Sequence, residues 1–117
     1  ECFFMAKDDY YVIAYRILAY LYACLKEGTP PDMSYIKADS SVISINQSYW
    51  EYIIRHLCDD GYLEGITLFR VVGQETPGIK MLNPMITPKG IEFLQNNSAM
   101  AKARDFLKTV KETIPGL

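Results

Sequence analysis

The order of the expected elements predicts an α+β fold, a winged helix-turn-helix with a three-helix core, a β-hairpin wing and additional C-terminal helices. Helical periodicity and helix-capping residues mark the chain before residue 61 and after residue 87, and a segment rich in β-branched and aromatic residues lies between them. The chain has 117 residues, 50% of them hydrophobic, which is enough to bury one core without disulfides or a metal. We therefore expect a single domain over residues 1–117.

The first helix is expected over residues 9–27. Acidic residues precede it, a lysine lies in its last turn, and Gly28 stands where a C-cap glycine belongs. Its apolar side chains cover most of the helix circumference, which indicates burial on more than one side. The apolar stretch 10–25 contains Arg16 and five tyrosines, and it is shorter than the roughly 20 residues that a membrane span needs. We expect no membrane insertion.

Two further helices are expected between the first helix and the hairpin. Prolines end the first helix, and a short, weak helix follows over about 34–40. The third helix covers about 46–60, and it begins either with a capping box from Ser44 to Gln47 or with an Asn46 cap. Its core-facing side chains recur at helical spacing: Trp50, Ile53, Ile54 and Leu57.

A β-hairpin is expected over about 62–87, with a loop of about six residues at the turn cluster 73–78. A Thr-Pro pair then opens a helix over about 88–96, and Ser98 is expected to cap a last helix over about 99–114. Apolar residues of the last helix step by three and four, as in helices that pack nearly parallel. We predict that these residues and residues of the first helix form a helix-packing interface, either within the chain or between the two copies of a dimer. Its members are Tyr15, Leu18, Tyr22, Met100, Ala103, Leu107, Val110 and Ile114.

Two segments carry a resemblance to a known family: residues 45–66, I-N-Q-S-Y-W-E-Y-I-I-R-H-L-C-D-D-G-Y-L-E-G-I, and residues 83–103, N-P-M-I-T-P-K-G-I-E-F-L-Q-N-N-S-A-M-A-K-A. They resemble the YjcQ family, small proteins of Gram-positive bacteria and their prophages. The I-T-P-K-G-I-E-F-L-Q-N-N-S run is the most specific part. The resemblance implies the winged-helix fold and a bacterial or phage cytoplasmic setting. It implies no functional residues, because the family has no established activity.

The third helix occupies the recognition position of a winged helix, and its outward face offers candidate DNA contacts. Lying in a major groove, it would bring Ser48, Tyr52 and Arg55 to base edges or phosphates. Arg70 and Lys80 are the candidate contacts on the wing. The charge opposes strong binding, because this helix has one arginine against three acidic residues and the whole chain carries a net charge of −2.

No catalytic arrangement emerges from the sequence. The single histidine, His56, stands two residues from Cys58, and such positions point about 200° apart around a helix, so they cannot form a thiolate–imidazole pair. The hairpin loop lacks the Lys-Ser or Lys-Thr of a phosphate-binding loop. We expect a protein that is not an enzyme and that uses no metal or cofactor.

Three cysteines without metal-type spacing, and an N-terminus without a signal peptide, favour free thiols in a cytoplasmic protein. Two functions stay open. One is a DNA-binding protein, a small bacterial or prophage transcriptional regulator, whose partner is double-stranded DNA. The alternative is a winged-helix module for protein association or dimerisation that binds no DNA. The architecture favours the first and the acidic balance favours the second. A homodimer would serve both functions.

Overall fold

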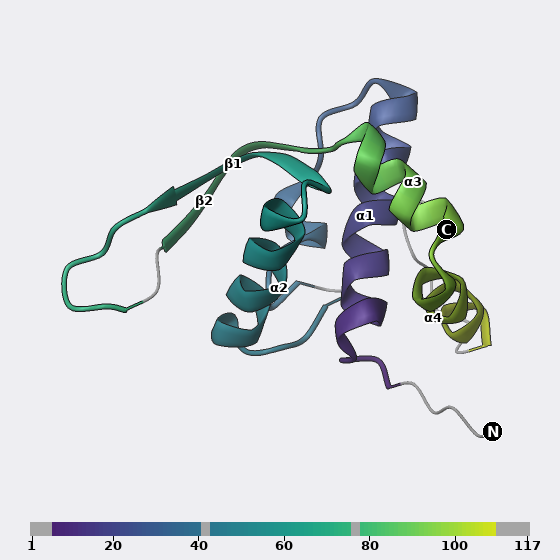
Figure 1. Cartoon of the computed structure of the whole chain (residues 1–117), viewed down its shortest axis with the longest axis horizontal. Coiled ribbons are helices and arrows are strands. Elements are labelled where there is room, and N and C mark those ends of the chain that lie inside the picture. The colour runs from purple at the N-terminus through teal and green to yellow at the C-terminus, as the bar shows by residue number, and fades with distance from the viewer. Residues whose placement is uncertain (1–5, 41–42, 76–77, 110–117) are drawn as a thin grey trace.

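The computed structural model describes residues 6–40, 43–75 and 78–109, and this part of the chain forms an α+β fold (Figure 1). Four α-helices and one two-stranded antiparallel sheet make up its regular structure, together with one turn of 3-10 helix. This order is compatible with a winged helix. The elements are α1 (Tyr10–Glu27), η1 (Met33–Tyr35), α2 (Gln47–Asp59), β1 (Leu63–Phe69), β2 (Gly78–Ile86), α3 (Pro88–Asn96) and α4 (Ser98–Thr109).

Helix α1 runs through the middle of the molecule, with α2 and the hairpin on one side and α3 and α4 on the other (Figure 1). Residues 12–19 of this helix are all buried, including Arg16, which is 4% exposed. The helix ends as expected at Gly28, whose φ of 73° suits a residue without a side chain. None of the helices in the described part of the chain is long and apolar enough to cross a membrane.

Helix α2 confirms the helix predicted over about 46–60 and its core face. Asn46 is its N-cap, because the Asn46 side chain accepts a hydrogen bond from the Tyr49 N–H at 2.8 Å. The alternative capping box is wrong, since Ser44 instead forms a β-bridge with Asp39. The Trp50 indole N–H donates to the carbonyl of Ile36 at 2.7 Å, which ties α2 to the loop before it. The core-facing residues Trp50, Ile53, Ile54 and Leu57 are all buried.

The short helix expected over 34–40 is wrong. The structure has only one turn of 3-10 helix, Met33–Tyr35, and the chain then continues in irregular conformation. Ile36 and Ala38 are buried while Lys37 and Asp39 are exposed. Residues 36–40 form turns and bends, with hydrogen bonds from the N–H of Lys37 to the carbonyl of Met33 and from the N–H of Ser40 to the carbonyl of Lys37, and a continuous helix would have turned the two apolar side chains away from each other. A single turn of 3-10 helix therefore precedes α2 where the sequence predicts a second helix.

The structure confirms the predicted β-hairpin, which projects away from the helices (Figure 1). Its register starts with Leu63 opposite Ile86 and shifts at a bulge around Gly65, so that Ile66 lies opposite Met81. The two strands are joined by residues 70–77, a longer connection than the six residues expected from the turn cluster.

The C-terminal helices begin with side-chain caps. The Thr87 hydroxyl accepts a hydrogen bond from the Gly90 N–H at 3.0 Å, which confirms the predicted start of α3. Ser98 is not the cap of α4, as the sequence suggested, but its first residue. The Asn97 side chain accepts hydrogen bonds from the N–H groups of Ala99 at 2.8 Å and Met100 at 3.3 Å, so Asn97 is the cap. The described part of α4 ends at Thr109, and the predicted end at residue 114 lies outside the described residues.

Candidate nucleic-acid interface

The candidate DNA contacts lie on α2 and on the hairpin, which share one side of α1 (Figure 1). Ser48 and Tyr52 are exposed on α2, and Tyr52 retains 48% of its surface. Arg70 and Lys80 are exposed on the hairpin. Arg55 is only partly accessible, because its Nε atom is buried. Four of the five predicted contacts are thus open to a large partner, and the fifth is partly covered.

Tyr52 also belongs to a cluster that joins α2 to the start of α1. Its ring centroid lies 4.3 Å from that of His56 and 6.3 Å from that of Tyr10, which in turn lies 5.2 Å from that of Tyr11. We call Tyr10, Tyr11, Tyr52 and His56 the aromatic cluster. This cluster has no signal in the sequence, because its members come from two helices about 40 residues apart and no local pattern indicates which aromatic faces meet.

A hydrogen bond beside the aromatic cluster strengthens the same contact between α1 and α2. The Tyr49 hydroxyl donates to the carbonyl of Asp8 at 2.7 Å. The start of α1 is therefore held against the exposed side of α2, and this junction fixes the orientation of the candidate recognition helix.

The two ends of α2 differ in electrostatics. Asp59 and Asp60 are exposed where the helix ends, and the negative charge of Asp60 contributes to raising the pKa of Tyr10. The N-terminal end carries the exposed Ser48, and the positive end of the helix dipole lies there. The helix dipole favours an anion at this N-terminal end, while burial and the charges of Asp8 and Asp9 beside it raise the pKa of Tyr49.

The Tyr10 phenol makes the free energy of unfolding depend on pH in the alkaline range. Burial, reinforced by the charge of Asp60, raises the pKa of Tyr10 to about 12. In the unfolded chain a tyrosine phenol ionises near pH 10. Between about pH 10 and pH 12 the unfolded chain therefore loses the phenol proton of Tyr10, while the folded chain keeps it. Stability should therefore fall as pH rises through this range, and Tyr10→Phe should make the fall less steep.

Urea unfolding of the wild type and Tyr10→Phe at several pH values from about 9 to 11.5 measures this difference in slope. Tyr11→Phe is the matched control, because it removes a neighbouring hydroxyl from a more exposed ring, 43% accessible. Equal slopes for the wild type and Tyr10→Phe would contradict the interpretation.

The predicted helix interface is buried inside one chain. Helices α1 and α4 pack against each other, and on α1 the interface residues Tyr15 and Leu18 are 7% and 0% exposed. On α4, Met100, Ala103 and Leu107 are each 0% exposed. These five side chains pack within the chain and offer no surface to a second copy. They therefore give no support to the predicted homodimer, which stays a prediction.

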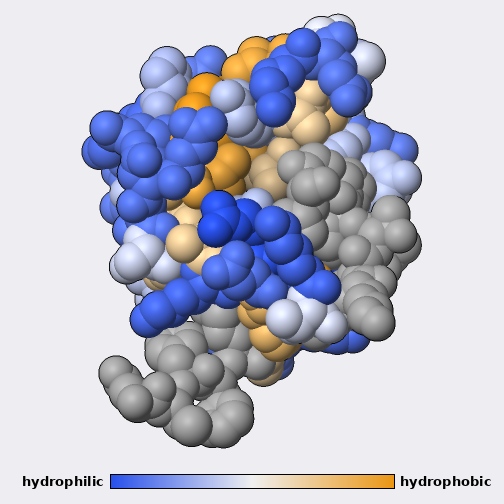
Figure 2. Space-filling view, turned by 90° about the vertical axis from the view of Figure 1, so that its right-hand side faces the viewer, coloured by the Kyte–Doolittle hydropathy of each residue, from blue (hydrophilic) through white to orange (hydrophobic). Residues whose placement is uncertain are grey.

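The other three interface residues are placed differently. Tyr22 is half-buried, and the Lys26 Nζ lies 4.5 Å from the centre of its ring. Val110 and Ile114 lie outside the described residues. Figure 2 shows the side of the molecule that carries α3 and α4, where hydrophilic side chains surround the apolar surface left exposed among the described residues.

Cys58 lies in an environment that suppresses thiol chemistry. Burial, together with the charge of Asp59, raises the pKa of the Cys58 thiol. A thiol with a raised pKa stays protonated near neutral pH and is a poor nucleophile. His56 stacks on Tyr52 in the aromatic cluster. These surroundings suit structural roles for both residues.

The sequence model of the family described as YjcQ protein matches residues 15–113. The chain belongs to the YjcQ family. The match confirms the resemblance seen in the two segments and extends it back to residue 15 in α1, across the hairpin and on to residue 113. No curated protein and no solved structure gave a significant match.

Proposed function

We propose that this YjcQ protein is a winged-helix protein that binds double-stranded DNA, as a small bacterial or prophage transcriptional regulator. The observation that carries the proposal is the exposed outward face of α2, followed directly by a hairpin that projects on the same side of α1. In winged-helix proteins this arrangement places the helix in the major groove and lets the hairpin contact the neighbouring backbone.

Electrostatics define how the duplex would lie. Ser48 and Tyr52 would face the bases, and the exposed cations Lys37, Arg70 and Lys80 would face phosphates. The exposed carboxylates at the C-terminal end of α2 would stay outside the contact. With three phosphate contacts, the logarithm of the affinity should fall with the logarithm of salt concentration at a slope of about −3. Such a small set of cations makes sequence-specific contacts necessary for tight binding.

Binding of a random pool of fluorescent duplexes, followed by anisotropy at about 50 mM salt, tests the proposal. Arg70→Ala and Lys80→Ala should each weaken binding and reduce the salt slope by about one. The control is Lys108→Ala, which removes an exposed charge on α4, across α1 from the hairpin. Absence of duplex binding at this salt concentration would rule out the proposed function.

A second function, association with another protein, is favoured by apolar side chains on the hairpin. Leu68, Phe69, Val72 and Leu82 are 42%, 46%, 101% and 65% exposed. Phosphates do not attract such side chains, and clustered apolar exposure is typical of protein contacts. If the duplex pool does not bind, loss of self-association on Val72→Ser and Leu82→Ser, measured by sedimentation, would support this function.

A further inference from the structure

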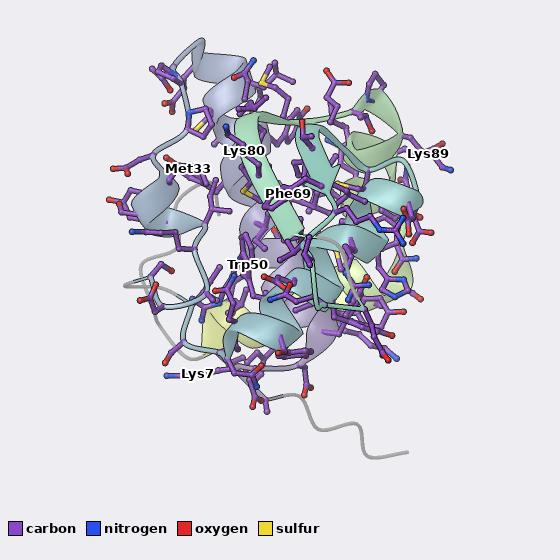
Figure 3. All side chains as sticks on the ribbon, turned by 90° about the vertical axis from the view of Figure 1, so that its left-hand side faces the viewer. Lys7, Met33, Trp50, Phe69, Lys80 and Lys89 are labelled. Carbon is purple, nitrogen blue, oxygen red and sulfur yellow. The ribbon has the colours of Figure 1, made fainter. Side chains whose placement is uncertain are left out.

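A groove lies between the hairpin and the loop that contains η1. Its volume is about 350 Å³, and it is lined by residues from the loop, from α2 and from β2. This volume falls at the lower end of the range of roughly 300–1,000 Å³ that is usual for small-molecule sites. Figure 3 views this side of the molecule, where Met33, Trp50 and Lys80 come from these three elements.

The apolar part of the groove is formed mainly by Met33, Trp50, Ile79 and Met81. Trp50 is 7% exposed, and its indole N–H is already bonded to the carbonyl of Ile36. The indole N–H therefore needs no polar partner from a ligand, and the small part of Trp50 that stays exposed lines the floor of the groove. The two methionines have flexible, polarisable side chains that adapt to ligands of different shape. This lining fits an aliphatic chain or an aromatic ring.

The polar part of the groove is positively charged. Lys37 comes from the loop and Lys80 from β2, and both are exposed, while Asp39 is the acidic residue among the lining residues. Helix α2 starts at Gln47, which also lines the groove, so the positive end of this 13-residue helix is directed to the same place. The carboxylates of Asp39 and of Glu51, which accepts a hydrogen bond from the Gln47 side chain at 3.2 Å, oppose the two lysines, and the positive end of the helix dipole shifts this balance in favour of an anion.

We propose that this groove binds a small amphipathic anion, a carboxylate that carries an aliphatic chain or an aromatic ring. The carboxylate lies between Lys37 and Lys80, and the apolar part covers the Trp50 ring. Binding joins the hairpin to the loop before α2. It also engages Lys37 and Lys80, two of the proposed phosphate contacts, so the ligand and a duplex compete for the same side chains. This competition rests on the proposed function, whereas binding of the anion does not.

Tryptophan fluorescence tests the proposal without DNA, because Trp50 is the only tryptophan of the chain. The full chain is titrated with octanoate, and with octan-1-ol and octylammonium as uncharged and cationic ligands of the same length. Octanoate should give a saturable change in Trp50 emission with half-saturation near about 1 mM, as expected for a ligand of this size. The alcohol and the amine should bind at least about threefold more weakly.

Variants of the two lysines locate the carboxylate. Lys37→Gln and Lys80→Gln should each weaken octanoate binding about threefold, and the double variant about tenfold. Lys108→Gln, on the far side of α1, should bind octanoate as the wild type does. Thermal melts of all variants show that they fold. The proposal is overturned if octanoate gives no saturable change up to about 20 mM, if octan-1-ol binds equally well, or if the folded double variant keeps wild-type affinity.

Discussion

Gly65→Ala should unfold the base of the hairpin, whereas Gly73→Ala should be tolerated. Both glycines have positive φ, 79° and 85°, so each substitution carries the cost of a left-handed conformation, about 1–2 kcal/mol. Only at Gly65 would the new Cβ overlap the backbone carbonyl of Asn83, while at Gly73 no heavy atom lies within 4 Å. We expect Gly65→Ala to lower the free energy of unfolding by more than about 3 kcal/mol, because the backbone must move.

Urea unfolding of the two variants measures this difference, and cross-strand contacts between Ile66 and Met81 in NMR spectra report on the register. Gly73→Ala is the matched control, since it shares the backbone conformation and lacks the close neighbour. Equal losses of stability in the two variants would show that the positive φ alone accounts for the cost of Gly65→Ala. The strands would then approach each other less closely at Gly65 than they do in the structure.

The helices could be predicted because their signals are local. Asn46 caps α2 and Thr87 caps α3, and each lies within a few residues of the amide to which it bonds. Gly28, at the end of α1, likewise lies next to the helix that it ends. The cap of α4 was misplaced by one residue, because Asn97 and Ser98 are both good N-caps and their order in the chain does not indicate which one faces the free amides.

Features that depend on distant partners could not be predicted in this way. The turn cluster indicates a hairpin, but the bulge at Gly65 depends on which residues of β2 lie opposite. The segment after η1 is too short for its pattern to distinguish a helix from irregular turns, and the bridge between Asp39 and Ser44 is not visible in the sequence.

The candidate DNA interface was predicted in part for the same reason. Helical spacing identifies the outward face of α2, and the structure leaves Ser48 and Tyr52 exposed there. The spacing does not show that Tyr10 lies beside Tyr52, or that Lys37 lines a groove together with Lys80. These contacts join segments about 40 residues apart, and only the tertiary fold defines them.

Leu107→Ala should destabilise the single chain without changing its oligomeric state. Leu107 is 0% exposed in α4, which packs on α1, so its truncation leaves a cavity in the core that joins the two helices. Such substitutions cost about 2–5 kcal/mol. Lys108→Ala, at the next and exposed position, should change stability by less than about 0.5 kcal/mol. Urea unfolding of the two variants measures both effects.

Protein concentration separates packing within the chain from packing between copies. If the side chains of α4 stabilise one chain, the loss caused by Leu107→Ala is the same at low and high protein concentration, because unfolding of a single chain is independent of concentration. If instead they join two copies, Leu107→Ala has little effect on the unfolding of the isolated chain and shifts the sedimentation coefficient from that of a dimer to that of a monomer. This second result would contradict the packing of α4 within one chain. It would require Leu107 to be covered by a second copy of the protein and not by α1.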